Sequence, residues 1–145
     1  MKVVIQRVKK AECRIDGKII SQIGKGLLIF VGIEQGDEIR NAKKLANKCG
    51  NLRIFEDREG KMNFSLKEVR GEILVISQFT LCADCDKGLR PSFDRAYPSG
   101  EASILYKKFI ELLAAQDIQV KEGIFGKRMS ISLVNEGPAT FILSS

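Results

Sequence analysis

The sequence predicts a single α+β domain in which two helices cover a mixed, mostly antiparallel β-sheet. Short strand-like segments fill most of the 145 residues, and two segments carry apolar residues at helical spacing. No repeat, low-complexity tract or linker divides the chain. We therefore expect one domain over residues 1–145, a length at which a chain buries roughly 68–70% of its unfolded surface.

Strand-like segments open the chain. Asp16-Gly17 is a two-residue hairpin signal between two such segments. Gly26–Ile33 is apolar without alternation, which is typical of a strand covered on both faces. The strands expected in this part of the chain are Lys2–Lys9, Glu12–Ile15, Lys18–Ile23 and Gly26–Ile33.

Two segments are predicted to be helical. Asp37 is the expected N-cap of the first helix, and Gly50 is its expected stop signal. The second helix is expected over Glu101–Gln116. One face of each helix should pack on the sheet, because apolar residues recur at helical spacing: Ile39, Ala42, Leu45, Ala46 and Cys49 in the first, and Ala102, Leu105, Tyr106, Phe109, Ile110 and Leu113 in the second.

The remaining segments complete the sheet. Glu56–Lys61 is predicted as a charged turn, and Asn135–Pro138 as the turn between the last two strands. Glu72–Leu81 reads as a long buried strand, and the polar pair Ser77-Gln78 in it needs an explanation, because buried polar groups require partners. The strands expected after the first helix are Leu52–Phe55, Glu72–Leu81, Ile118–Glu122, Met129–Val134 and Thr140–Leu143.

The charge balance favours a polyanionic partner. The chain has 24 Lys and Arg against 18 Asp and Glu, a formal net charge of +6. Phosphate contacts of a nucleic acid fit this excess, although many small soluble proteins are also mildly basic. The loop-like stretch after Cys82 carries Lys87, Arg90 and Arg95, which could hold a phosphate-bearing substrate.

The absence of histidine excludes more chemistry than any motif adds. Ser-His-Asp sites, Cys-His sites and His-rich metal sites cannot be built from this chain alone. Gly24–Gly26 lacks the Gly-Lys-Ser/Thr ending of a phosphate-binding loop. All four cysteines would have to converge to hold a structural zinc, so we expect reduced thiols, no metal and no cofactor.

The sequence also predicts a cytoplasmic protein that does not enter a membrane. No stretch approaches the ~18 consecutive apolar residues of a transmembrane helix. The N-terminal segment lacks a run long enough for the core of a signal peptide.

Two polar segments remain as candidate functional sites. Ser77-Gln78-Phe79-Thr80 places two hydroxyls at a strand end, although such a segment alone is more often strand polarity satisfied by the backbone. Gly137-Pro138 alone is simply a turn. Neither segment defines a function by itself.

Taken together, these segments resemble the D-aminoacyl-tRNA deacylase family. Its two signature motifs stand here as Ser77-Gln78-Phe79-Thr80 and as Asn135-Glu136-Gly137-Pro138-Ala139-Thr140. The similarity runs from the opening MKVVIQRV through NLRIFED and LVISQFTL to NEGPATF. Two motifs in the correct order within a full-length match are far more specific than either one alone.

The resemblance implies a fold and an activity. The sheet would be barrel-like, as in the deacylases, and the enzyme would be a homodimer that hydrolyses the ester of D-aminoacyl-tRNA and of mischarged glycyl-tRNA. The intact Ser77-Gln78-Phe79-Thr80 segment favours the D-specific branch of the family. The 2′-hydroxyl of the tRNA would assist catalysis, which agrees with the missing histidine.

The resemblance also assigns site residues. Ser77, Gln78, Phe79 and Thr80 would surround the terminal adenosine and the ester. In such proteins the Gly-Pro peptide is cis and enters the partner subunit's site, where it rejects L-amino acids; here this would be Gly137-Pro138 of a motif that begins at Asn135. Arg7 and Met129 match positions that support the Gly-Pro loop.

Two alternatives belong to other classes. A non-catalytic RNA- or DNA-binding module on the same fold is compatible with the net charge of +6. A thiol- or zinc-dependent enzyme could be centred on Cys82 and Cys85. Hydrolysis of D-Tyr-tRNA discriminates the first alternative, and the metal content of the purified protein discriminates the second.

Overall fold

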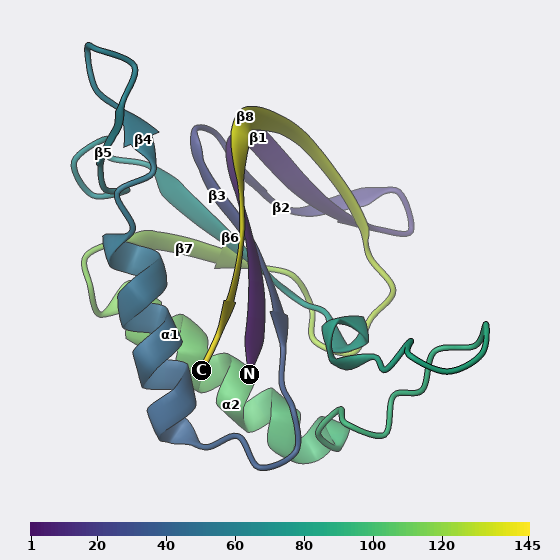
Figure 1. Cartoon of the computed structure of the whole chain (residues 1–145). Coiled ribbons are helices and arrows are strands. Elements are labelled where there is room, and N and C mark those ends of the chain that lie inside the picture. The colour runs from purple at the N-terminus through teal and green to yellow at the C-terminus, as the bar shows by residue number, and fades with distance from the viewer.

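A curved sheet covered by helices on one side dominates the computed structural model, which describes residues 1–145 (Figure 1). Its helices are α1 (Ile39–Asn51), α2 (Ser99–Ala114) and the short 3-10 helix η1 (Phe79–Cys82). Its strands are β1 (Lys2–Ile15), β2 (Lys18–Ile23), β3 (Gly26–Gly32), β4 (Phe55–Glu56), β5 (Met62–Phe64), β6 (Glu72–Ser77), β7 (Gln119–Glu122) and β8 (Ser130–Ser144).

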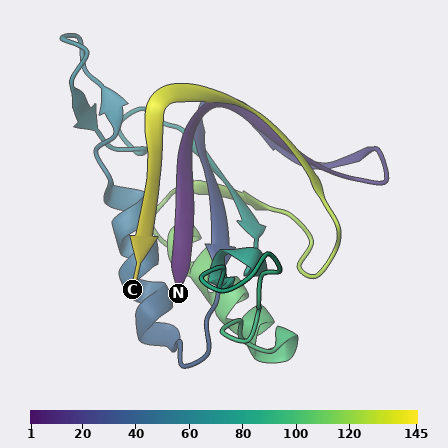
Figure 2. The ribbon, with the colours of Figure 1, turned by 45° about the vertical axis from the view of Figure 1, so that its right-hand side comes forward.

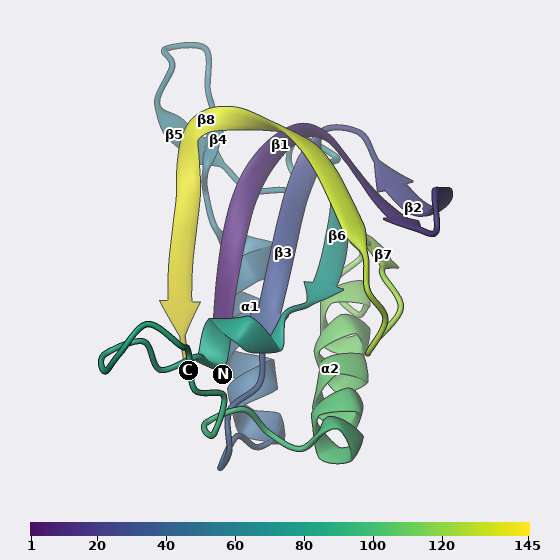
Figure 3. The same cartoon turned by 90° about the vertical axis from the view of Figure 1, so that its right-hand side faces the viewer.

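The main sheet is mixed, with strand order β2-β1-β3-β6-β7 and with β8 paired to β1. The pairs of β1 with β2, β3 and β8 are antiparallel, whereas β3, β6 and β7 run parallel. The long strands β1 and β8 arch together over the other strands (Figures 2 and 3). The predicted α+β class with a mixed, mostly antiparallel and barrel-like sheet is confirmed.

The central strands are apolar on both faces because both faces are covered. On one face Leu27, Ile29 and Val75 join a 22-residue core with α1 and α2. On the other face Leu28 and Leu74 belong to a second cluster, which the far half of β1 and β8 encloses. The structure therefore explains why Gly26–Ile33 shows no alternation.

The start of α1 differs from the prediction. Glu38, and not Asp37, is the N-cap, and its N–H donates to Asn41 Oδ1 at 2.8 Å. Asp37 is instead buried, because it accepts from the N-terminal ammonium of Met1 at 2.5 Å and from the N–H of Glu34 at 2.7 Å. A carboxylate held in this ion pair is not free to cap the helix.

Glycine has a packing role near the end of α1. The helix continues through Gly50, the predicted stop signal, and ends at Asn51. Gln116 and Ile118 lie where a Cβ of residue 50 would stand. Gly50 therefore allows the close approach of the segment after α2, and it does not serve as a left-handed cap.

Two predicted strands are shorter than expected. β6 ends at Ser77, because the chain turns into η1, so the strand predicted to Leu81 is wrong beyond that point. The strand predicted over Leu52–Phe55 is reduced to β4, which forms a small hairpin with β5 around the predicted charged turn. This hairpin projects beyond the sheet above α1 (Figure 1).

The predicted C-terminal turn is wrong, because Asn135–Pro138 lies within β8. The strands predicted over Met129–Val134 and Thr140–Leu143 therefore belong to one strand, β8. In the same way, the strands predicted over Lys2–Lys9 and Glu12–Ile15 form one strand, because β1 runs unbroken from Lys2 to Ile15 beside β8. Register shifts opposite Val8 accommodate the curvature where the two strands arch.

Neither α1 nor α2 is long and apolar enough to cross a lipid bilayer.

Candidate active site

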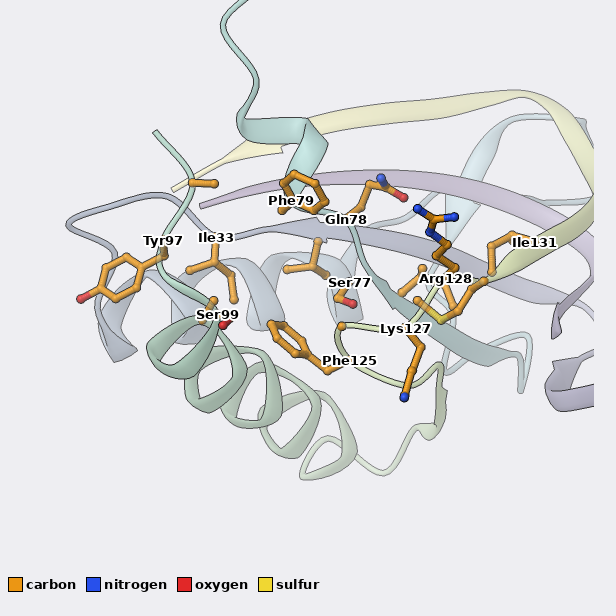
Figure 4. A pocket seen from close by; sticks show the side chains of 16 residues that line it. Ile33, Ser77, Gln78, Phe79, Tyr97, Ser99, Phe125, Lys127, Arg128 and Ile131 are labelled. Carbon is orange, nitrogen blue, oxygen red and sulfur yellow. The ribbon is translucent and has the colours of Figure 1, made fainter. Parts of the chain in front are cut away.

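A cavity of about 560 Å³ opens where β6 ends, which is within the usual size range of small-molecule sites. Its walls come from the ends of β3 and β6, from the start of η1, from the start of α2 and from the turn before β8 (Figure 4). Of the predicted site residues it contains Ser77, Gln78, Phe79 and Met129. The remaining lining residues are Val31, Ile33, Ile76, Ala96, Tyr97, Ser99, Ala102, Phe125, Gly126, Lys127, Arg128 and Ile131.

Two backbone N–H groups at the strand end have no acceptor within the turn that follows it. The N–H of Gln78 donates to the carbonyl of Val31 at 2.7 Å, which ties the segment to β3. The first hydrogen bond of η1 runs from the N–H of Leu81 to the carbonyl of Gln78 at 3.2 Å. The turn therefore provides no acceptor within itself for the N–H groups of Phe79 and Thr80. Ser77 and Gln78 are half-buried, which explains the polarity of this strand end.

Thr80 lies outside the pocket lining, although its motif neighbours are inside it. Its hydroxyl oxygen accepts a hydrogen bond from Gln78 Nε2 at 2.6 Å. The structure thus connects Thr80 to the pocket through the amide of Gln78, and no carboxylate or other base hydrogen-bonds to Thr80.

The aromatic side chain of Phe79 lies at the exposed edge of the pocket. Its side chain is 57% exposed, a large value for phenylalanine, and its ring contacts Phe93 edge-on at a centroid distance of 5.0 Å. An exposed ring held in this way offers a face on which a planar group can stack.

The wall opposite η1 is formed by residues that the sequence analysis missed. Gly126 has a φ of +75° in a turn closed by the N–H of Lys127 on the carbonyl of Ile124 at 3.2 Å. Phe125 packs on Tyr106 with their ring centroids 5.5 Å apart, and the Tyr106 hydroxyl donates a hydrogen bond to the carbonyl of Val75 at 2.9 Å. Burial raises the pKa of this hydroxyl, so it stays a donor. The glycine between Phe125 and two cations is the only sequence signal for this turn.

Arg7 is buried beside the second motif. Its side chain is 2% exposed, and it donates to the carbonyl of Glu136 at 2.9 Å, to the carbonyl of Ile54 at 2.6 Å and to Glu56 Oε1 at 2.7 Å. One guanidinium therefore joins β1 to the residue before Gly137 and to the segment that leads into β4.

Gly137-Pro138 forms a cis peptide and lies far from the pocket of its own chain. The pair falls between residues of β8 that pair with Gln6 and Val8, which in turn face Leu28 and Gly26. That level is roughly 10–16 Å along β3 from Val31, at ~3.3 Å per residue. At this level β8 is separated from β6 by three strand spacings, roughly 14 Å along the sheet. Asn135 shares this remote position.

The loop cations and the cysteines are not part of the pocket. Lys87 and Arg90 are exposed and outside its lining, and Arg95 pairs with Asp84 at 2.9 Å. Cys13, Cys49 and Cys82 are buried, Cys85 is exposed, and all four are free thiols. No group of three or more Cys, Asp or Glu side chains is placed to hold a metal ion.

The fold and the site define a small α+β protein with a pocket that is lined by hydroxyls, a side-chain amide and two cations. Comparison with known proteins identifies its family. A family model described as D-Tyr-tRNA(Tyr) deacylase matches residues 4–144. The chain belongs to the D-Tyr-tRNA(Tyr) deacylase family.

Curated relatives and solved structures agree with this family. D-aminoacyl-tRNA deacylases of Thermodesulfovibrio yellowstonii and Geotalea daltonii are 54% and 52% identical and match 98% and 100% of this chain, and 97% of their own lengths. The solved structure of a c-Myc DNA unwinding element binding protein has a TM-score of 0.93 and 38% identity over 100% of this chain and 99% of its own. A probable eukaryotic D-amino acid tRNA deacylase has a TM-score of 0.83 at 17% identity, over 99% and 98% of the two chains, and shares the fold.

Proposed function

We propose that this protein hydrolyses the ester between a D-amino acid, or glycine, and the 3′ end of tRNA. The observation that carries the proposal is the pocket at the end of β6, which gathers Ser77, Gln78 and Phe79 in a chain half identical to curated deacylases. The tRNA is the substrate, and the net charge of +6 favours its approach. The cytoplasm, where translation takes place, is the expected compartment.

The ester would lie against the N–H groups at the start of η1. Fixed backbone donors stabilise the oxyanion that develops when an ester carbonyl is attacked. The terminal adenosine would occupy the rest of the pocket, with its base near the exposed ring of Phe79. The chain has no histidine to activate a nucleophile, so the adjacent 2′-hydroxyl of the substrate would assist the reaction. No metal or cofactor is required in this scheme.

A second copy of the chain would complete the site. The Gly-Pro peptide stands too far from the pocket of its own subunit to contact a substrate there. In a two-fold dimer, Gly137-Pro138 of each subunit would enter the other subunit's pocket near Met129 and hold the substrate's α-amino group. Arg7 would fix the loop through the carbonyl of Glu136. Asn135, in the same motif, would lie beside the substrate.

Chiral selection follows from this arrangement. A rigid peptide placed against the α-carbon leaves room for hydrogen or a D side chain and causes a clash with an L side chain. The enzyme would therefore proofread by rejection of L-aminoacyl-tRNA, and it would depend little on the identity of the side chain.

Deacylation of matched substrates tests the proposed function. D-Tyr-tRNA and Gly-tRNA should be hydrolysed, whereas L-Tyr-tRNA should survive with the same enzyme, because only the L side chain clashes. Release of labelled amino acid over time measures all three. Equal hydrolysis of the D- and L-esters would contradict chiral selection, and no hydrolysis of any of the three would contradict the proposed activity.

A second candidate function is DNA binding without catalysis. It is favoured by the likeness to the 38% identical structure, which is that of a DNA unwinding element binding protein. The deacylation assay separates the two candidates, because a binding module would retain duplex DNA and leave D-Tyr-tRNA intact.

A further inference from the structure

The turn between β7 and β8 carries two cations that the ester chemistry does not use. Lys127 and Arg128 are exposed, line the pocket and form no ion pair. Most other pocket residues are apolar or neutral, so these two side chains set the charge of the opening. Cations without a carboxylate partner at the mouth of a ligand pocket are available to an anionic ligand.

The turn is anchored on both sides of the cations. Phe125 packs on the buried Tyr106, and Met129 packs against the second core cluster and close to Gly123. The positive φ of Gly126 reverses the chain between these anchors. Lys127 and Arg128 therefore project from a fixed backbone, which lowers the entropy lost when they bind a ligand.

The two side chains point in different directions. In Figure 4 the guanidinium of Arg128 turns to the side of the pocket on which Gln78 lies, whereas the side chain of Lys127 extends away from it. Arg128 is thus the cation better placed to meet a ligand whose reactive end lies at Gln78. Its planar fork also matches two oxygens of a phosphate.

We propose that Arg128 binds the 5′-phosphate of the terminal adenosine, the phosphodiester that joins it to the preceding nucleotide. This subsite rests on the proposed function, which puts the 3′-ester at the start of η1. The 5′-phosphate then lies across the ribose from the ester and must leave the pocket at its rim. Arg128 lines the pocket from the turn before β8 with its guanidinium on the side of Gln78 (Figure 4), and Lys127 adds to the positive potential there. The contact positions the nucleotide and takes no part in the chemistry.

Two small substrates that differ only in this phosphate test the proposal. They are 3′-O-D-tyrosyl-adenosine and the same ester carrying a 5′-monophosphate. Wild-type enzyme should hydrolyse the phosphorylated ester with a kcat/KM about tenfold or more higher, since hydrogen bonds to charged groups are worth roughly 1.5–3 kcal/mol. The difference should lie in KM, because the phosphate is equally bound in the ground and transition states.

Variants assign the preference to one side chain. Arg128→Gln should abolish the preference, so that the phosphorylated and unphosphorylated esters are hydrolysed with equal kcat/KM, and Arg128→Lys should restore part of the preference. On D-Tyr-tRNA, the slope of log affinity against log salt should fall by about 0.7 in Arg128→Gln, the value for one single-stranded phosphate contact. Lys44→Gln, on the exposed face of α1, is the control for the loss of one charge.

Failure of the phosphate subsite can be distinguished from failure of the proposed deacylase activity. Equal rates of wild-type enzyme on the two esters, or a parallel loss on both in Arg128→Gln, would overturn the phosphate subsite while the deacylase activity stands. If wild-type enzyme hydrolyses neither these esters nor D-Tyr-tRNA, the proposed function fails and the subsite fails with it.

Discussion

D-Tyr-tRNA that ends in 2′-deoxyadenosine should be hydrolysed about 10²–10⁴-fold more slowly than the same tRNA with a 2′-hydroxyl, the range for loss of an acid–base group. The chain contains no histidine, and no carboxylate or amine hydrogen-bonds to the hydroxyl of Ser77 or Thr80. In the proposed scheme, the substrate's own 2′-hydroxyl is the remaining group next to the ester. Single-turnover rates with the amino acid on the 3′-oxygen of both tRNAs measure the effect.

Thr80→Ala provides the matched comparison on the enzyme side. The hydroxyl of Thr80 meets the pocket only through the side-chain amide of Gln78, so its loss should lower the rate by far less than the ~10²–10³-fold that is typical for loss of an oxyanion donor. Thr80→Ser keeps the acceptor for Gln78 and should restore the rate. Fast hydrolysis of the 2′-deoxy substrate, or an acyl-enzyme trapped on Thr80, would establish covalent catalysis instead.

Arg7→Ala should lower the free energy of unfolding by about 2–6 kcal/mol, because each of two backbone carbonyls left without its donor costs roughly 1–3 kcal/mol. The substitution removes three hydrogen bonds at once and leaves the carbonyls of Ile54 and Glu136 without their donor. Urea unfolding monitored by circular dichroism measures the change. Arg40→Ala, which breaks an exposed ion pair with Glu38, should stay within about 1 kcal/mol of wild type.

Arg7→Lys separates stability from selectivity. A lysine keeps the charge but cannot reach the acceptors on both β8 and the β4 segment with a planar fork. We expect a folded protein with a less firmly held Gly-Pro peptide, and therefore increased hydrolysis of L-Tyr-tRNA relative to D-Tyr-tRNA. Wild-type discrimination in a folded Arg7→Lys protein would show that Arg7 has only a structural role.

Local sequence patterns predict helices and strands well where the side chains of the segment itself determine its structure. The hairpin at Asp16-Gly17, the two-sided strand β3 and the apolar faces of both helices all stand as expected. Helix ends are less predictable, because tertiary contacts decide them. The N-terminal ammonium engages Asp37, and packing against Gln116 requires Gly50 inside the helix.

The candidate site is only partly predictable for the same reason. Ser77, Gln78 and Phe79 line one pocket as the motif suggests, whereas Lys127 and Arg128 reach it from a turn about fifty residues later in the chain. The Gly-Pro segment has the pattern of a turn, because glycine and proline are rare within strands. It nevertheless lies within β8, where β1 and β8 curve and their register shifts.

We propose that each active site combines the pocket of one subunit with the Gly-Pro peptide of the other. Mixed dimers of two inactive variants test it most directly. Ser77→Phe fills the pocket, and Gly137→Val blocks the peptide that would enter the partner. In its own chain, a Cβ at residue 137 meets only the side-chain amide of Asn135 at 3.1 Å, and this amide can shift.

Each variant alone should be unable to hydrolyse D-Tyr-tRNA. After the two are unfolded, mixed and refolded together, random pairing puts one intact pocket opposite one intact Gly-Pro peptide in half of the dimers. The mixture should therefore recover about a quarter of the wild-type sites. Activity of the mixture no higher than the mean of the two separate variants would contradict a site shared between subunits.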